Sequence, residues 1–151
     1  RLQAAMRESD FVVRWGGEEF LAVARDTDRD RADELAERIR AGIADQPFRL
    51  DDGQHLNVTC SVGHAAWPFL PAHPQAVDWL GVVSLADLGL LAAKRTGRNA
   101  WVGLHGTPAA LPEGLLRRAQ AAPLGLLASG EIAVSSSRPL EHVAGALTAL
   151  G

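Results

Sequence analysis

Two adjacent glutamates, Glu18 and Glu19, follow two glycines, Gly16 and Gly17, between two short apolar runs. Paired glycines in such a place are typical of a tight hairpin, because glycine adopts the positive φ that the turn requires. The turn would present two carboxylates beside backbone that a ligand can approach closely. Mg²⁺ commonly bridges one or two carboxylates to substrate phosphates. On these four residues alone, however, a solvated acidic turn is the more common explanation.

Lys94 is the only lysine among the 15 basic residues, so any chemistry that needs an ammonium group must use it. It lies near the end of a helix-compatible segment, where the helix dipole also favours a solvated cation. Arg98 follows four residues later, a spacing that makes two side chains neighbours on a continuous helix. Gly97 between them favours a turn instead.

Four segments of the chain resemble the GGDEF family, in its GGEEF form, and they occur in the family's order. They are Arg7-Glu8-Ser9-Asp10 with Gly16-Gly17-Glu18-Glu19-Phe20 after five intervening residues, the strand-like Val58-Thr59-Cys60-Ser61-Val62-Gly63, the pair Ala86-Asp87, and Ala93-Lys94-Arg95-Thr96-Gly97-Arg98-Asn99. Together they span about two thirds of the chain, up to Leu104. The combination is far more specific than any one motif, and it shifts the balance from the solvated turn to function.

The resemblance implies an α/β (α+β) fold, with a mixed or antiparallel central sheet flanked by helices, related to nucleotidyl-cyclase and polymerase palm domains. It implies an enzyme, a diguanylate cyclase, in which two GTP-loaded domains meet as a homodimer and form cyclic di-GMP with Mg²⁺ or Mn²⁺ as cofactor. The resemblance implies that the GTP phosphates lie along Gly16 and Gly17. It implies that Glu18 ligates the metal with Glu19 assisting, and that Lys94 and Arg98 bind phosphate.

The resemblance also implies an inhibitory product site at the RxxD motif, where Arg7 and Asp10 would bind cyclic di-GMP. The arginine fork suits this ligand, because it can bond guanine or a phosphate through two donors at once. Arg38 matches the position that completes the site from a neighbouring domain. The alternative for Arg38 is an i,i+4 ion pair with Glu34 on a solvated helix face.

The chain departs from the family in two respects. Leu91 stands where the family usually has tyrosine, a change that keeps the apolar bulk. More severely, the family's first strand and helix, with a metal-binding aspartate, a phosphate lysine and the residues that read guanine, have no counterpart here. The expectation is that the parent protein has this segment upstream of Arg1, or that the chain is a fragment.

Hydrophobic periodicity and turn residues predict the elements that position these groups. In chain order we predict the end of a helix at 1–7, strands at 11–15 and 20–24, a helix at 32–44, a strand at 56–63, a loop at 67–74, a helix at 80–95 and a strand at 100–104. Composition changes near Gly106, where Ala, Leu and Gly begin to dominate. We therefore predict a GGDEF domain at 1–105 and an appendage at 106–151, with a helix, a strand at 132–134 and a closing helix.

Composition excludes several classes of function. The net charge of -3 gives no global attraction to nucleic acid, and no apolar run is long enough to span a membrane. The single cysteine, Cys60, fits a cytoplasmic location, with the chain as the cytoplasmic part of a larger, membrane-anchored sensor as one alternative. We expect Cys60 to be core filler. We expect the four tryptophans to be packing residues: Trp15, Trp67, Trp79 and Trp101.

Two functions remain open, besides a structural domain in which the motif occurs by chance. The first is a diguanylate cyclase, which the intact GGEEF favours because a pure receptor has no need of both glutamates. The second is an inactive GGDEF module that binds cyclic di-GMP through Arg7 and Asp10, which the missing upstream segment favours.

Overall fold

The structure is a computed structural model that describes residues 1–148, and it has the mixed α and β composition that the sequence predicts. A short turn of 3-10 helix, η1 (Gln3–Ala5), precedes the hairpin of β1 (Phe11–Gly16) and β2 (Glu19–Val23). A second turn, η2 (Arg29–Arg31), leads into α1 (Ala32–Ala44). The prediction of a helix end over 1–7 was wrong, because only one turn of 3-10 helix forms and the backbone is extended at Met6.

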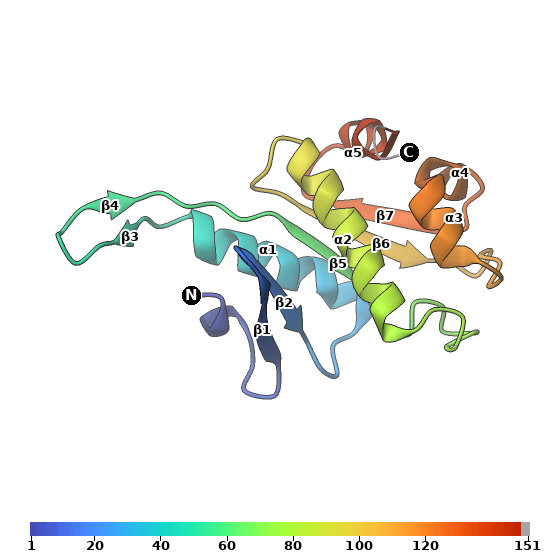
Figure 1. Ribbon diagram of the computed structural model, residues 1–151, viewed down its shortest axis with the longest axis horizontal. Helices are drawn as coiled ribbons and strands as arrows, with labels where there is room; N and C mark the ends of the chain where they lie inside the picture. Colours follow the sequence, from blue (N-terminus) through green and yellow to red (C-terminus); the bar gives the residue numbers. More distant parts are fainter. Residues whose placement is uncertain (149–151) are drawn as a thin grey trace.

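The predicted strand at 56–63 is divided in the structure. Its start belongs to a small hairpin of β3 (Phe48–Arg49) and β4 (His55–Leu56), which projects from the body of the molecule (Figure 1). Its end belongs to β5 (Val62–Ala65). The residues between them alternate between apolar and polar side chains but pair with no strand in the described part of the chain, so alternation alone predicted too long a strand.

The main sheet has three strands in the order β5-β6-β7. β5 runs parallel to β6 (Trp101–Gly106), and the connection between them is α2 (Trp79–Arg95). Asp78 caps α2, since its Oδ1 accepts a hydrogen bond from the Gly81 N–H at 2.7 Å. The β1–β2 hairpin pairs with no third strand among residues 1–148.

The C-terminal extension, residues 106–148, contains the predicted strand and closing helix, but two helices precede the strand where one was predicted. Two short helices, α3 (Leu115–Ala121) and α4 (Pro123–Ala128), precede β7 (Ile132–Ser136), and α5 (Leu140–Thr148) closes the described chain. β7 pairs antiparallel with β6, so the extension supplies the third strand of the main sheet. The domain boundary at 105/106 stays a prediction.

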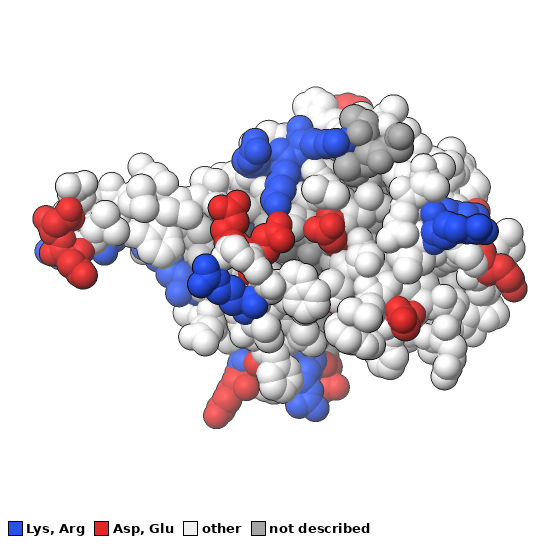
Figure 2. Space-filling view, in the orientation of Figure 1, with Lys and Arg blue, Asp and Glu red and all other residues white. Residues whose placement is uncertain are grey.

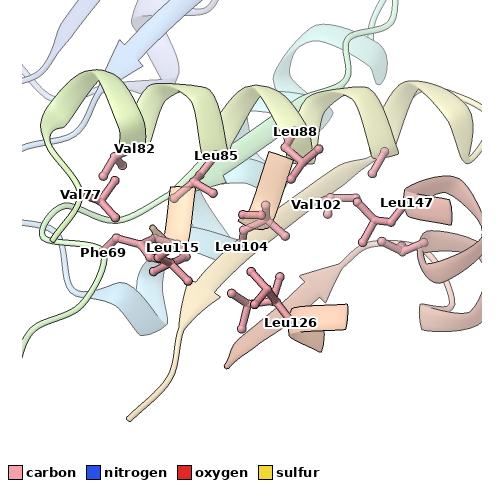
Figure 3. Packing of buried hydrophobic residues seen from close by; sticks show 14 of the residues in the cluster. Phe69, Val77, Val82, Leu85, Leu88, Val102, Leu104, Leu115, Leu126 and Leu147 are labelled. Atoms are coloured by element: carbon pink, nitrogen blue, oxygen red, sulfur yellow. The ribbon is translucent and has the colours of Figure 1, made fainter. Parts of the chain in front are cut away.

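One face of the main sheet is apolar and carries the core. Figure 3 shows Leu85 and Leu88 of α2 pointing toward Val102 and Leu104 of β6. The helices of the extension close the same core with Leu115, Leu126 and Leu147, all nearly inaccessible to solvent. These buried side chains hold α2 in a fixed position on the sheet.

Gly63 lets α2 lie unusually close to β5. A Cβ added at Gly63 would lie 2.0 Å from the Ala86 carbonyl oxygen and 2.1 Å from the Leu90 nitrogen, both backbone atoms of α2. No side chain fits there, which is a physical reason for the glycine that ends the VTxSxG-like segment. The position of Lys94 at the end of α2 therefore depends on Gly63.

The tryptophans are less buried than the sequence predicts. The exposed fractions of Trp15, Trp67 and Trp79 are 53%, 65% and 58%, so the prediction that they pack was wrong for these three. Trp101 is half-buried and donates from Nε1 to Glu37 Oε2 at 3.0 Å. Cys60 is also half-buried, and burial raises the pKa of its thiol. No helix within residues 1–148 combines the length and the apolar character that crossing a membrane requires.

Candidate functional site

The glycine–glutamate tip forms the tight turn that the sequence predicts. Gly16 pairs with Glu19, and Gly17 has a φ of +51°, a left-handed value that favours glycine. Arg14 donates from Nε to the Gly17 carbonyl at 2.9 Å and holds the turn from the side. No atom of residues 1–148 lies within 4 Å of a Cβ added at either glycine, so the backbone of the tip is open to a ligand.

The structure brings the tip together with the end of α2. Lys94 Nζ lies 3.0 Å from Glu19 Oε1, although the two residues are 75 positions apart in the sequence. The only lysine of the chain thus contacts a carboxylate of the motif. Both side chains are partly exposed, at 34% and 46%. Such a pair contributes at most about 1 kcal/mol to stability, so Lys94 can exchange this partner for another anion at little cost.

Glu18 and Arg98 have no side-chain hydrogen bond or ion pair with the described residues. Glu18 lies in the turn beside Gly17, and Arg98 lies just after α2, in a left-handed conformation with a φ of +60°. Figure 2 shows basic side chains gathered over the C-terminal end of α2, with acidic side chains directly beside them. Opposite charges on two elements would suit a ligand that carries both phosphate and metal.

The residues present fit only part of a metal site. No group of three or more His, Cys, Asp or Glu side chains within residues 1–148 is placed to hold a metal ion. The tip offers the Glu18 and Glu19 carboxylates, and Mg²⁺ can take one or two carboxylates together with phosphate oxygens and water. The hairpin could therefore hold Mg²⁺ jointly with a nucleotide.

The RxxD residues lie beside Arg38 of the same chain, whereas the resemblance implies that Arg38 of a neighbouring domain completes the site. Arg7, Asp10 and Arg38 line one pocket of about 50 Å³, and Arg7 and Asp10 also line a neighbouring one of about 250 Å³. Arg38 donates from Nε to the Ala5 carbonyl at 3.0 Å. It makes no ion pair with Glu34 within the part of the chain that the structure describes, so that alternative is not the observed arrangement.

Asp10 is oriented by the backbone on both sides. Its Oδ2 accepts from the Arg7 N–H at 2.8 Å, and its Oδ1 accepts from the Arg25 N–H at 3.1 Å. The hydrogen bond from Arg7 is the largest cause that lowers the pKa of Asp10, and the charges of Arg7 and Arg38 lower it further. A charged acceptor between two arginines can receive the N–H groups of a guanine edge while the arginines bind phosphate.

A polar network on the second face of the main sheet escaped the sequence prediction. Asp33 of α1 accepts from Ser135 Oγ at 2.7 Å, and Ser135 Oγ lies 2.7 Å from His105 Nε2. His64 Nε2 is 3.0 Å from Asp33 Oδ1, but it is buried and not aligned for a hydrogen bond. Burial lowers the pKa of His64 and of His105, against the opposing charge of Asp33. These residues are far apart in sequence and match no motif, so only the fold reveals them.

The comparisons with known proteins agree with the geometry. Residues 1–100 match the family model described as "Diguanylate cyclase, GGDEF domain". The response regulator PleD of Caulobacter vibrioides is 39% identical over 104 residues, which are 68% of this chain and 22% of PleD.

The relatives that carry the name diguanylate cyclase include DgcP and DosC. DgcP of Pseudomonas aeruginosa is 38% identical over 98 residues, 65% of this chain and 14% of DgcP. DosC of Escherichia coli is 33% identical over 94 residues, 62% of this chain and 19% of DosC. The chain thus spans about a quarter or less of the length of the curated relatives it matches. The chain belongs to the GGDEF-domain family of diguanylate cyclases.

Proposed function

We propose that this chain is the part of a diguanylate cyclase that holds the phosphates of GTP between the hairpin tip and the end of α2. The observation that carries the proposal is the 3.0 Å contact of Lys94 with Glu19, which places a cation beside the motif carboxylates. Gly16 and Gly17 leave the backbone of the tip open to the phosphates. Lys94 and Arg98 neutralise phosphate charge, and Glu18 and Glu19 hold the metal.

The reaction joins two such domains. The 3′-hydroxyl of each GTP releases its proton to solvent, and its oxygen forms a bond to the α-phosphorus of the other GTP. The bond from that phosphorus to the β-phosphate oxygen breaks, and pyrophosphate leaves with the electron pair. Mg²⁺, when bound, supplies charge neutralisation at the phosphates. The cations of this chain contribute the same kind of stabilisation, which is effective because it is in place before negative charge develops. One domain holds one GTP, so a homodimer completes the reaction.

The product site is a second part of the proposal. Cyclic di-GMP binds at Arg7 and Asp10, with Arg38 supplying a further cation, and thereby inhibits synthesis. The shared pocket and the doubly oriented Asp10 carboxylate support this assignment.

The alternative, an inactive module that binds cyclic di-GMP, also has an observation in its favour. The residues of the product pocket come together within one chain, whereas the hairpin offers only two carboxylates to a metal. The two functions differ in a simple way, since a receptor would bind the product without a need for GTP or Mg²⁺.

The coupling of metal to nucleotide tests the cyclase proposal. Because phosphate oxygens complete the metal shell, Mg²⁺ should bind weakly alone and more tightly with a non-hydrolysable GTP analogue. Calorimetric titration of Mg²⁺ with and without the analogue measures this. Glu18→Gln should abolish the difference, while Glu34→Gln, on α1, should keep it. Equal Mg²⁺ affinity in both conditions would contradict a shared metal–nucleotide site at the hairpin.

A further inference from the structure

The C-terminal extension reaches back to the turn that joins α2 to β6. Where β7 ends, Ser137 donates its N–H to the Trp101 carbonyl at 3.1 Å and accepts from the Trp101 N–H through Oγ at 2.9 Å. Ser136 Oγ also donates to the Trp101 carbonyl, at 3.1 Å, and accepts from the Arg138 N–H at 2.9 Å. These contacts fix the segment 136–138 against the first residue of β6.

The turn itself has an unusual backbone. Gly97, Arg98 and Asn99 have φ values of +104°, +60° and +46°, so three consecutive residues lie in the left-handed region. Two of them carry a Cβ, and left-handed backbone in such residues persists only where its surroundings hold it. A backbone hydrogen bond ties Arg98 to α2, from the Arg98 N–H to the Ala93 carbonyl at 3.2 Å.

Two arginines from distant elements hold this turn. Arg40 of α1 donates from Nη1 to Asn99 Oδ1 at 2.8 Å. Arg138 of the extension donates from Nη2 to the carbonyls of Arg98 and Asn99, at 3.2 and 3.5 Å. Arg138 is therefore the contact that acts on the backbone of Arg98 itself, whereas Arg40 acts on the side chain of its neighbour.

We infer that Arg138 is a positioning residue for the phosphate-binding end of α2, and that the C-terminal extension thereby helps to shape the nucleotide site. By holding the two carbonyls, Arg138 fixes the backbone from which Arg98 projects, one turn beyond Lys94. The inference rests on the proposed function, since it is the GTP phosphates that Arg98 is proposed to bind. Arg138 is engaged with carbonyl oxygens, so its effect on nucleotide binding is indirect.

The experiment uses the 151-residue chain and three variants. Arg138→Ala removes the contact, Arg138→Lys keeps a charge and a donor, and Arg117→Ala is the matched control. Arg117 is an exposed arginine of the same extension whose side chain makes no hydrogen bond to the described residues. Three quantities are measured for each: the affinity for a non-hydrolysable GTP analogue with Mg²⁺, the hydrogen-exchange rate of the Arg98 amide, and the thermal midpoint.

Loss of one solvent-accessible hydrogen-bonding group should weaken the affinity of Arg138→Ala for the analogue by roughly 2- to 10-fold. Exchange of the Arg98 amide should become faster by a similar factor, while the thermal midpoint stays near that of wild type. Arg138→Lys should recover part of both losses, and Arg117→Ala should show neither.

Unchanged affinity and exchange in Arg138→Ala would overturn the inference. Weaker affinity with unchanged Arg98 exchange would overturn it as well, because Arg138 would then act on the phosphates directly through its charge. A wild-type chain that does not bind the analogue would instead overturn the proposed function, and the role of Arg138 at a phosphate site would fall with it. The first two outcomes can be observed only if the wild-type chain binds the analogue. Failure of the inference about Arg138 is therefore distinguishable from failure of the proposed function.

Discussion

Replacing Gly63 by alanine should strongly destabilise the protein and displace the end of α2. The added Cβ would meet three backbone atoms of α2 at 2.0, 2.1 and 2.7 Å, and ordinary contact begins near 3.4 Å. Backbone atoms cannot rotate away as a side chain can. The helix must therefore move outward by more than an ångström, or β5 must bend.

The size of the effect follows from what holds α2. Leu85 and Leu88 lie on the same helix as Ala86 and Leu90. Moving that helix therefore loosens the buried contacts of Leu85 and Leu88 with the sheet. Overpacking usually costs about 1–3 kcal/mol, and a clash with backbone lies at or above the upper end of that range. A loss of about 3 kcal/mol should lower the thermal midpoint by roughly 6–12 °C in a domain of this size.

Gly42→Ala is the matched control. Gly42 lies in α1 and is exposed, and no described atom lies within 4 Å of a Cβ added there. The same chemical change there should stabilise the helix by up to about 1 kcal/mol. Urea unfolding followed by far-UV circular dichroism gives both values. A Gly63→Ala variant within about 0.5 kcal/mol of wild type would refute the close approach of α2 to β5.

Three further predictions test the sites and the polar network. Lys94→Ala should weaken binding of the GTP analogue by roughly 10-fold or more, because it removes a charge-assisted contact. It should change the free energy of unfolding by no more than about 1 kcal/mol, because the pair of Lys94 with Glu19 is exposed. A large loss of stability would contradict this. Arg7→Ala should weaken cyclic di-GMP binding by roughly 10- to 150-fold. Calorimetry measures this, with Arg49→Ala on β3 as the control. Unchanged affinity would mean that cyclic di-GMP binds at another site. The free energy of unfolding should fall as the pH drops below 6.5, because His64 takes up a proton in the unfolded chain, whereas its lowered pKa keeps it neutral in the folded chain. His64→Gln should reduce the dependence of the unfolding free energy on pH. An unchanged pH dependence in that variant would contradict this prediction.

The sequence predicts those parts of the fold that local chemistry determines. The Gly16-Gly17 pair requires a turn whatever surrounds it, and the hairpin forms within a residue of the predicted bounds. The helices at 32–44 and 79–95 follow from apolar periodicity in the same way. The likeness to GGDEF proteins, rather than periodicity, singled out Lys94 as a site residue, and the contact with Glu19 is consistent with that choice.

The rest depends on tertiary partners that spacing does not reveal. Val58 and its neighbours alternate as a strand does, but pairing begins only at Val62, because β6 offers no partner earlier. The network of Asp33, His64 and Ser135 joins residues more than 100 positions apart. The role of the extension was equally hidden: its small and apolar residues predict helices, but not that β7 would add to the main sheet.

The most direct test of the central claim is product formation from GTP and Mg²⁺, followed by chromatography, in a longer protein that also supplies the family's first strand and helix. The proposed function predicts cyclic di-GMP from wild type and a loss of about 10²- to 10³-fold for Glu19→Gln, the magnitude typical of removing a group that stabilises the transition state. Residues 1–151 alone should yield no product, because the hairpin supplies only one side of the metal site. Undiminished turnover by Glu19→Gln, or turnover by residues 1–151 equal to that of the longer protein, would contradict the account.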